Sequence, residues 1–206
     1  MQDRLTGRGI KYLVHFTKYS NFPSIMINGL LRRTELDRRG LCYNFNDDMR
    51  LDRHPETLSV SIGFPNYKMF YRARQDYADD TWVVLFLHPN VLIQKPCAYY
   101  ARNAATGCYK DTNPQSLQNK ASFDAMFSDI GPVKRSDLGI PDHFTTDPQA
   151  EVLVFADIES KYIIGVGAQN DAQRAEILYN YTRFKDKSVQ SLPQLFKPRE
   201  DYEHWT

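Results

Sequence analysis

Two polar side chains stand close together in an otherwise apolar stretch near the start of the chain. His15 and Thr17 lie in the segment 12–17, Tyr-Leu-Val-His-Phe-Thr, whose composition is typical of a short buried strand. Residues i and i+2 of a strand share one face, so the imidazole and the hydroxyl are expected side by side. Such a pair can hydrogen-bond the two hydroxyls of a ribose. The alternative is a histidine at a strand end that is satisfied by backbone groups.

A lone carboxylate, Glu151, begins a second apolar segment that continues to Phe155. A carboxylate bonded to a ribose 2′-hydroxyl gains strength as positive charge develops on the sugar, as it does in glycoside hydrolysis. The same group can then take a proton from an incoming nucleophile. The residue pattern is therefore compatible with cleavage of a nicotinamide–ribose bond. The alternative is a solvated acid at the start of a strand.

A third segment joins a strand to a helix. Residues 57–63 alternate apolar and polar side chains, and 66–74 read as a short helix after Pro65. Helix N-termini favour phosphate, and Lys68 adds a positive charge close by. Tyr67 or Tyr71 could stack on a nicotinamide ring. Alternatively, these aromatic side chains belong to the core and Lys68 is solvated.

The stretch from Lys95 to Arg135 carries six basic and three acidic residues, with aromatic side chains scattered among them. Such a composition could follow a sugar-phosphate backbone and stack its bases. An ordinary solvated loop explains it equally well.

The elements that must position these residues follow from hydrophobic periodicity and turn signals. Expected strands span 10–16, 57–63, 81–88, 151–155 and 162–167, and expected helices span 21–28, 66–74 and 172–179. Ser20 is expected to cap the first helix, and Asn28-Gly29 to end it. The charged residues 32–54 are expected to form a surface excursion. With no repeat and no clear linker, the sequence predicts one α+β domain over residues 1–206.

Composition excludes several classes of function. The net charge of +1 gives no global basic field, so any contact with nucleic acid must come from a local patch. Three cysteines, at 42, 97 and 108, match no metal-site spacing, and we expect no metal and reduced thiols. The polar N-terminus and the short apolar runs predict neither a secretory signal nor a membrane span. We therefore expect a cytoplasmic protein.

Taken in order, four short segments resemble the DarT family, the toxin half of a DNA-modifying toxin–antitoxin pair. They are 12–17, 21–30, 59–71 and 150–154, and together they spread over roughly residues 10–155. The resemblance implies an ADP-ribosyltransferase-like fold, with a split, strongly bent mixed sheet and NAD in its cleft. It also implies transfer of ADP-ribose from NAD to a base of single-stranded DNA, and a cognate antitoxin with ADP-ribosyl hydrolase activity.

The resemblance also implies roles for individual residues. Glu151 is expected to be catalytic, with Lys68 supplying positive charge near the nicotinamide ribose or the diphosphate. Expected contacts to NAD come from His15, Thr17, Asn21, Gly29, Asn66, Tyr67 and Tyr71. Expected contacts to DNA come from Tyr109, Lys110, Lys120, Lys134 and Arg135.

One position departs from the family pattern. Many thymine-modifying members carry a catalytic arginine after the second strand, where this chain has Asn66. The stretch Ser-Val-Ser-Ile-Gly-Phe-Pro-Asn-Tyr-Lys-Met-Phe-Tyr at 59–71 instead resembles the branch that modifies guanine, so guanine is the expected target. Other activities remain open: transfer to protein or RNA, plain NAD hydrolysis, or a nucleic-acid-binding module without catalysis.

Overall fold

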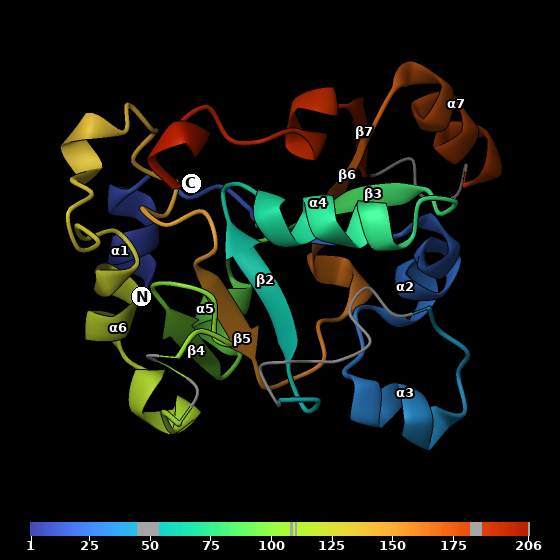
Figure 1. Cartoon of the computed structure of the whole chain (residues 1–206). Helices are drawn as coiled ribbons and strands as arrows, with labels where there is room; N and C mark the ends of the chain where they lie inside the picture. The colour runs from blue at the N-terminus through green and yellow to red at the C-terminus, as the bar shows by residue number, and fades with distance from the viewer. Residues whose placement is uncertain (45–53, 108, 110, 182–186, 206) are drawn as a thin grey trace.

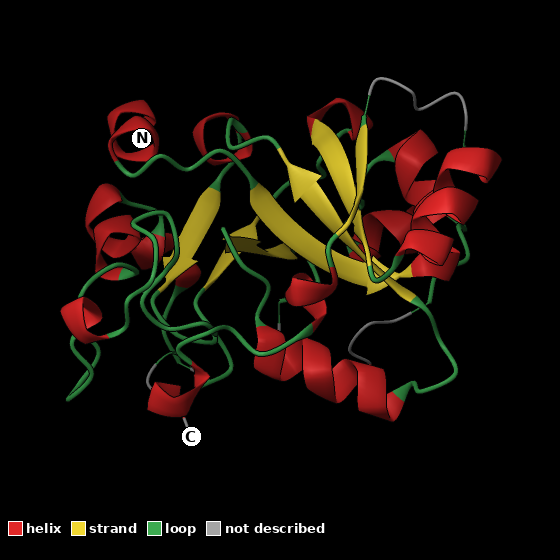
Figure 2. Cartoon of the chain, turned by 90° about the horizontal axis from the view of Figure 1, so that it is seen from above, coloured by secondary structure: helices red, strands yellow, loops and turns green. Residues whose placement is uncertain are grey.

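In the part of the chain that the structure describes, seven strands form one mixed sheet at the centre of the molecule (Figure 1; Figure 2). The computed structural model describes residues 1–44, 54–107, 109, 111–181 and 187–205. The strand order is β4-β5-β2-β1-β3-β6-β7, and every pair is antiparallel except β6 with β7. The strands are β1 Leu13–Lys18, β2 Leu58–Ile62, β3 Trp82–Leu87, β4 Cys97–Tyr100, β5 Glu151–Val154, β6 Ile163–Ala168 and β7 Ser188–Ser191.

The sheet splits between β1 and β2. These strands pair only at Leu13↔Ile62 and Val14↔Ser61. Beyond those two pairs β1 stays with β3 as far as Lys18, while β2 stays with β5 as far as Leu58. Two halves of the sheet therefore diverge from a short seam, and the expected split mixed sheet is confirmed.

Helices cover both faces of the sheet. The α-helices are α1 Gln2–Gly7, α2 Phe22–Asn28, α3 Arg33–Arg39, α4 Tyr67–Asp76, α5 Val91–Gln94, α6 Lys120–Ala125 and α7 Asp171–Asn180. Short 3-10 helices span Tyr19–Asn21, Pro114–Leu117, Arg135–Asp137, Ser160–Tyr162, Pro193–Phe196 and Tyr202–Trp205. Figure 1 shows α4 crossing in front of the sheet, and Figure 2 shows it along one side. None of the described helices combines the length and the apolar composition that crossing a bilayer requires.

Strand β3 shows how two cores form on one sheet. Val83, Leu85 and Leu87 join the core on the face that carries α2, α6 and α7. Trp82 and Val84 point the other way and pack with Phe70 of α4 and the C-terminal Leu195 and Phe196. Alternate side chains of a strand face opposite sides, so a fully apolar strand must be covered twice.

Most of the expected elements are confirmed. All five expected strands and the helices at 66–74 and 172–179 are present, with ends shifted by a few residues. Asn66 caps α4, its side chain accepting the Met69 N–H at 3.1 Å. The prediction that Ser20 caps α2 was wrong, because a 3-10 turn at Tyr19–Asn21 precedes that helix. Helix α3, within the expected surface excursion, was not predicted, and neither were α1, α5, α6, β4 and β7.

Gly29 ends α2 in a conformation that other residues do not adopt. Its φ and ψ are 83° and −177°, and a Cβ there would lie 2.4 Å from the Ile158 carbonyl oxygen. The close approach allows Leu30 and Ile158 to exchange two backbone hydrogen bonds, of 2.8 and 2.9 Å. Gly29 thus fastens the end of α2 to the segment after β5.

Replacing Gly29 by alanine should lower the free energy of unfolding by about 1–3 kcal/mol or more, because strained backbone and backbone overlap add. Urea denaturation measures the change. Gly7→Ala is the matched control: nothing lies within 4 Å of its Cβ position, and it ends the exposed helix α1. That control should be neutral or slightly stabilising. Equal effects from both substitutions would contradict the assignment.

Candidate active site

A cavity of about 720 Å³ lies where β1 and β2 separate. Its size is within the range typical of small-molecule sites. Its walls come from the ends of β1 and β2, from α3 and α4, and from the loop 103–106 after β4. Seven of the predicted site residues line it: His15, Thr17, Asn21, Gly29, Asn66, Lys68 and Glu151.

Ser59 joins the two most informative of these residues. Its backbone carbonyl lies 2.9 Å from His15 Nδ1, and its hydroxyl donates to Glu151 Oε2 at 2.6 Å. A carbonyl can only accept, so His15 Nδ1 carries a proton and donates to it. One residue of β2 therefore orients both the imidazole and the carboxylate. Sequence reasoning gave Ser59 no role, although the alternation of Ser59 and Ser61 placed both on one strand face.

The second oxygen of Glu151 is held by the backbone. The Ala104 N–H donates to Oε1 at 2.6 Å, and Glu151 is only 6% exposed. The turn that presents this amide is fixed by Asn103, which accepts from the Ala105 N–H at 2.8 Å and the Thr106 hydroxyl at 2.7 Å. The predicted acid is therefore a buried, hydrogen-bonded group in the cavity wall, and the solvated alternative is excluded.

Asn21 also lines the cavity and connects two of its segments. Its amide nitrogen donates to Thr17 Oγ1 at 3.2 Å and to the Asn44 carbonyl at 2.7 Å. Its amide oxygen accepts the Asn44 N–H at 2.8 Å. Thr17 is buried, so the Asn21 side chain connects the β1 hydroxyl with the segment 42–44, which also lines the cavity.

Helix α4 presents one face to the cavity. Lys68, Met69, Arg72, Ala73 and Asp76 line it, at spacings of three and four residues. Lys68 also donates to the backbone carbonyl of Trp205, so its ammonium is partly committed to the C-terminal segment.

The two tyrosines of α4 are not among the residues that line the cavity. Tyr67 and Tyr71 are four residues apart and share a different face, so neither lines the cavity. Tyr67 is buried, and burial raises its pKa, while Tyr71 is 56% exposed. The cavity lining therefore gives no support to the expected contact of Tyr67 or Tyr71 with NAD, which stays a prediction. Asn66 lines the cavity, but its side-chain oxygen caps the helix.

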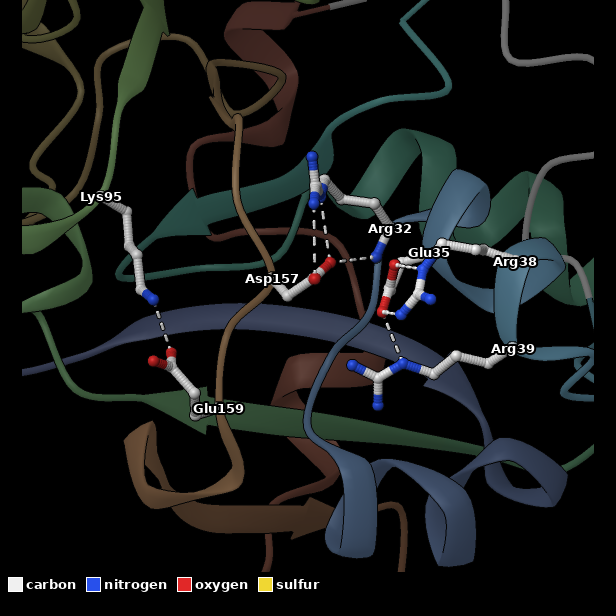
Figure 3. A network of polar contacts seen from close by, with 7 residues as sticks. All are labelled: Arg32, Glu35, Arg38, Arg39, Lys95, Asp157 and Glu159. Atoms are coloured by element: carbon white, nitrogen blue, oxygen red, sulfur yellow. Dashed lines mark hydrogen bonds and ion pairs between the residues drawn. The ribbon is translucent and has the colours of Figure 1, made fainter.

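Helix α3 forms a wall that sequence reasoning missed. Arg33 and Leu36 line the cavity. The start of the helix is anchored by Asp157, whose Oδ1 accepts from the Arg32 backbone N–H at 2.9 Å and from Arg32 Nε at 3.0 Å (Figure 3). Figure 3 also shows Glu35 pairing with Arg38 and Arg39, at 2.7 and 2.5 Å, and Lys95 pairing with Glu159 at 2.7 Å.

The residues predicted to bind DNA have different surroundings. Tyr109 packs edge-on against Tyr100, and its hydroxyl accepts the Ala101 N–H at 3.3 Å. Lys120 is exposed at the start of α6, and Lys134 is exposed but pairs with Asp129 at 3.1 Å. Lys110 lies outside the described residues.

Arg135 is hydrogen-bonded to the segment that precedes Glu151. Its guanidinium donates to Thr146 Oγ1 at 3.1 Å and to the carbonyls of Pro141 and Asp142 at 3.1 and 3.2 Å. Burial lowers its pKa. These bonds attach the side chain to the loop that leads to Glu151, and its expected contact with DNA stays a prediction.

The turn before Glu151 contains a second buried acid, Asp147. Burial raises the pKa of its carboxyl, against the opposing effects of the Gln149 N–H, which donates to it at 2.7 Å, and of nearby cationic groups. The Thr145 hydroxyl donates to the Asp147 backbone carbonyl at 3.0 Å. This turn places Gln149 and Glu151 together in the cavity wall.

The chain matches a known protein family in sequence and several solved structures in fold. The family model for DarT, described as an ssDNA thymidine ADP-ribosyltransferase, matches residues 14–202. No curated protein matches the chain in sequence.

Solved structures of low sequence identity share the fold. Thermosipho africanus DarTG in complex with ADP-ribose superposes with a TM-score of 0.65 at 15% identity, covering 90% of this chain. The match covers 51% of the Thermosipho chain, so this protein spans about half of that relative's length. Thermus sp. 2.9 DarT in complex with carba-NAD+ gives a TM-score of 0.55 at 12% identity, covering 91% of this chain and 98% of the other. The same Thermus protein with ADP-ribosylated ssDNA gives 0.53 at 11%, covering 92% and 97%.

Replacing Ser59 by alanine removes the hydroxyl donor to Glu151 and keeps the carbonyl that His15 uses. We expect the free energy of unfolding to fall by about 1.5–3 kcal/mol, the range for hydrogen bonds to charged groups. Urea denaturation measures the loss. Ser61→Ala is the matched control, since it lies two residues along the same strand and its hydroxyl makes no hydrogen bond within the described part of the chain. A loss as large in the control would contradict the role of Ser59.

Proposed function

The chain belongs to the DarT family, and we propose that it transfers ADP-ribose from NAD to a base of single-stranded DNA. The observation that carries the proposal is the buried Glu151 carboxylate, fixed through Ser59 to the imidazole of His15 within one cavity. The continuous seven-stranded sheet supports treating residues 1–206 as one catalytic domain.

The donor set of the cavity suits a dinucleotide. Arg33, Lys68 and Arg72 bring positive charge from α3 and α4 to a site that must hold a diphosphate. His15 Nε2 and the Thr17 hydroxyl offer polar partners for ribose hydroxyls and the carboxamide. Asn21 and Gly29 complete the wall beyond β1. Of the α4 cations, Lys68 keeps the role of placing charge near the diphosphate or the nicotinamide ribose.

NAD supplies the ribose carbon that becomes electrophilic as nicotinamide leaves. Glu151 accepts a hydrogen bond from the ribose 2′-hydroxyl, and this bond strengthens as positive charge develops on the sugar. The same carboxylate takes the proton that the base nitrogen loses as it attacks. Ser59 and the Ala104 amide hold the carboxylate in place, so that it need not reorient during the reaction. Single-stranded DNA suits this chemistry because a base within a duplex hides the atoms to be modified.

We further propose guanine as the target base. The support is Asn66. The family resemblance implies that many thymine-modifying members carry a catalytic arginine at this position, whereas here the Asn66 side-chain oxygen caps α4. No guanidinium can come from that position. The family description names thymidine instead, so the two bases are alternatives that one experiment can distinguish. The resemblance also implies an antitoxin that removes the ADP-ribose, and we include such a partner in the proposal.

Replacing Glu151 by glutamine keeps the shape of the side chain and removes its charge. We expect transfer to fall by about 100-fold or more, the scale seen when one group that stabilises a transition state is lost. The thermal shift given by NAD should persist, because the binding walls are unchanged. Mass spectrometry of an oligonucleotide measures the adduct. Glu159→Gln, which removes a carboxylate paired with Lys95 outside the cavity, is the control and should retain activity. Wild-type rates in Glu151→Gln would overturn the mechanism.

The target base follows from incubating the protein and NAD with four single-stranded oligonucleotides that each lack one base, beside duplex controls. We expect an added ADP-ribose on every strand except the one without guanine. An adduct that disappears only when thymine is absent would overturn the choice of base and keep the enzyme class. NAD consumption without any adduct would favour hydrolysis or a protein or RNA target. Neither adduct nor NAD consumption would favour a binding module.

A further inference from the structure

A buried ion pair near the end of the chain lies beneath the turn that carries Glu151. Arg199 is 2% exposed and Asp201 is 4% exposed. They meet through two hydrogen bonds, Nε to Oδ1 and NH2 to Oδ2, each of 2.6 Å. Burying two charges costs desolvation energy, so a pair of this kind stabilises a fold less than its short distances suggest. What it provides is a guanidinium held in one orientation.

The remaining donors of Arg199 bind the turn before Glu151. NH1 donates to the Thr145 carbonyl at 2.8 Å, and NH2 donates to the Thr146 carbonyl at 2.6 Å. Both threonines are buried. Arg135 binds the Thr146 hydroxyl, and the Met126 carbonyl accepts the Thr146 N–H at 2.9 Å. Arg199 is therefore the contact by which the C-terminal segment fixes the backbone five and six residues ahead of Glu151.

The same pair reaches the other wall of the cavity. Trp205 Nε1 donates to Asp201 Oδ2 at 2.8 Å, and the Trp205 carbonyl accepts from Lys68 of α4. Burial acts to raise the pKa of Asp201, but the hydrogen bonds from Arg199 and Trp205 and the charge of Arg199 together lower it. The carboxylate thus joins the Glu151 turn to the helix that carries Lys68. Two parts of the cavity wall are set by one C-terminal group.

We propose that Arg199 is a positioning residue that decides whether ADP-ribose passes to a base or to water. This inference rests on the proposed function. In both outcomes the bond between ribose and nicotinamide breaks, and its electron pair leaves with nicotinamide. In transfer a base nitrogen bonds to the ribose carbon and loses its proton to Glu151. In hydrolysis a water oxygen forms that bond and loses the proton. One nitrogen of a large, rigid base must be aligned with the ribose carbon and with Glu151, whereas water needs no such alignment, so loosening the backbone that leads to Glu151 penalises transfer more.

The test is Arg199→Lys in the full chain with NAD and single-stranded oligonucleotide. Lysine keeps the charge but cannot form the paired bonds to Asp201 and the two carbonyl bonds together. ADP-ribosylated DNA and free ADP-ribose are quantified in one reaction, and their ratio does not depend on the fraction of folded enzyme. We expect the ratio to fall about 10-fold, less than the roughly 100-fold cost of a 1 Å misplacement. The KM for NAD should change by a smaller factor than the ratio, because Arg199 does not line the cavity and reaches Lys68 only through Asp201 and Trp205.

Arg4→Lys is the matched control. Arg4 pairs bidentately with Asp124, at 2.8 and 2.6 Å, but donates to neither threonine. It should leave the ratio unchanged. If Arg199→Lys does not fold, Trp205→Phe removes one donor to Asp201 and should lower the ratio in the same direction by a smaller factor.

An unchanged ratio in a folded but less stable Arg199→Lys would overturn the proposal and leave the proposed function intact. A wild-type protein that forms free ADP-ribose but no DNA adduct would overturn the transferase function itself, and with it the role of Arg199.

Discussion

The early separation of β1 from β2 is the constraint on which the site depends. After two paired residues each strand follows a different neighbour, so backbone groups beyond the seam lose their ladder partners. The Ser59 carbonyl is one of these, and it accepts from His15 Nδ1 instead. An imidazole thus replaces backbone pairing where the sheet opens, and the opening becomes the cavity. The hydrogen bond that satisfies the Ser59 carbonyl at the split therefore also orients the His15 ring.

Burying a carboxylate in that opening demands donors, and they come from both sides of β5. The hydroxyl of Ser59 comes from β2, and the Ala104 amide comes from the loop after β4. Strand pairing brings these groups together, because Ser59 lies opposite Leu153 and Tyr100 lies opposite Glu151. A buried charge without such partners would be strongly destabilising. The proposed chemistry of Glu151 and the stability of the strand end at which it lies therefore require the same hydrogen bonds.

The walls of the cavity come from remote parts of the chain, and charge-assisted hydrogen bonds fasten them. Asp157 holds the start of α3, while the Arg199–Asp201 pair holds the Glu151 turn and, through Trp205, the Lys68 side of α4. Such bonds are short and directional, so they fix orientation as well as proximity. The net charge of +1 does not reveal this arrangement, because a sum over the sequence does not show which charges lie together. Arg32 with Asp157 and Arg199 with Asp201 each add nothing to that sum.

The sequence by itself determined five of the strands, three of the helices and the position of one acid, Glu151, at the start of a strand. Alternating apolar residues fixed β2, a fully apolar run fixed β3, and Asn66 marked the start of α4, since these signals act over a few neighbouring residues. Strand β4 was missed because its Cys-Ala-Tyr-Tyr sequence has neither alternation nor a β-branched residue, whereas the equally short β5 carries two valines. Only the tertiary structure decided which side chains face the cavity. It turned Tyr67 and Tyr71 away with one face of α4, joined Arg199 to carbonyls more than fifty residues earlier in the chain, and brought Ser59 between His15 and Glu151. Those partners are set by strand pairing and helix rotation between segments far apart in the chain, and a local pattern does not encode them.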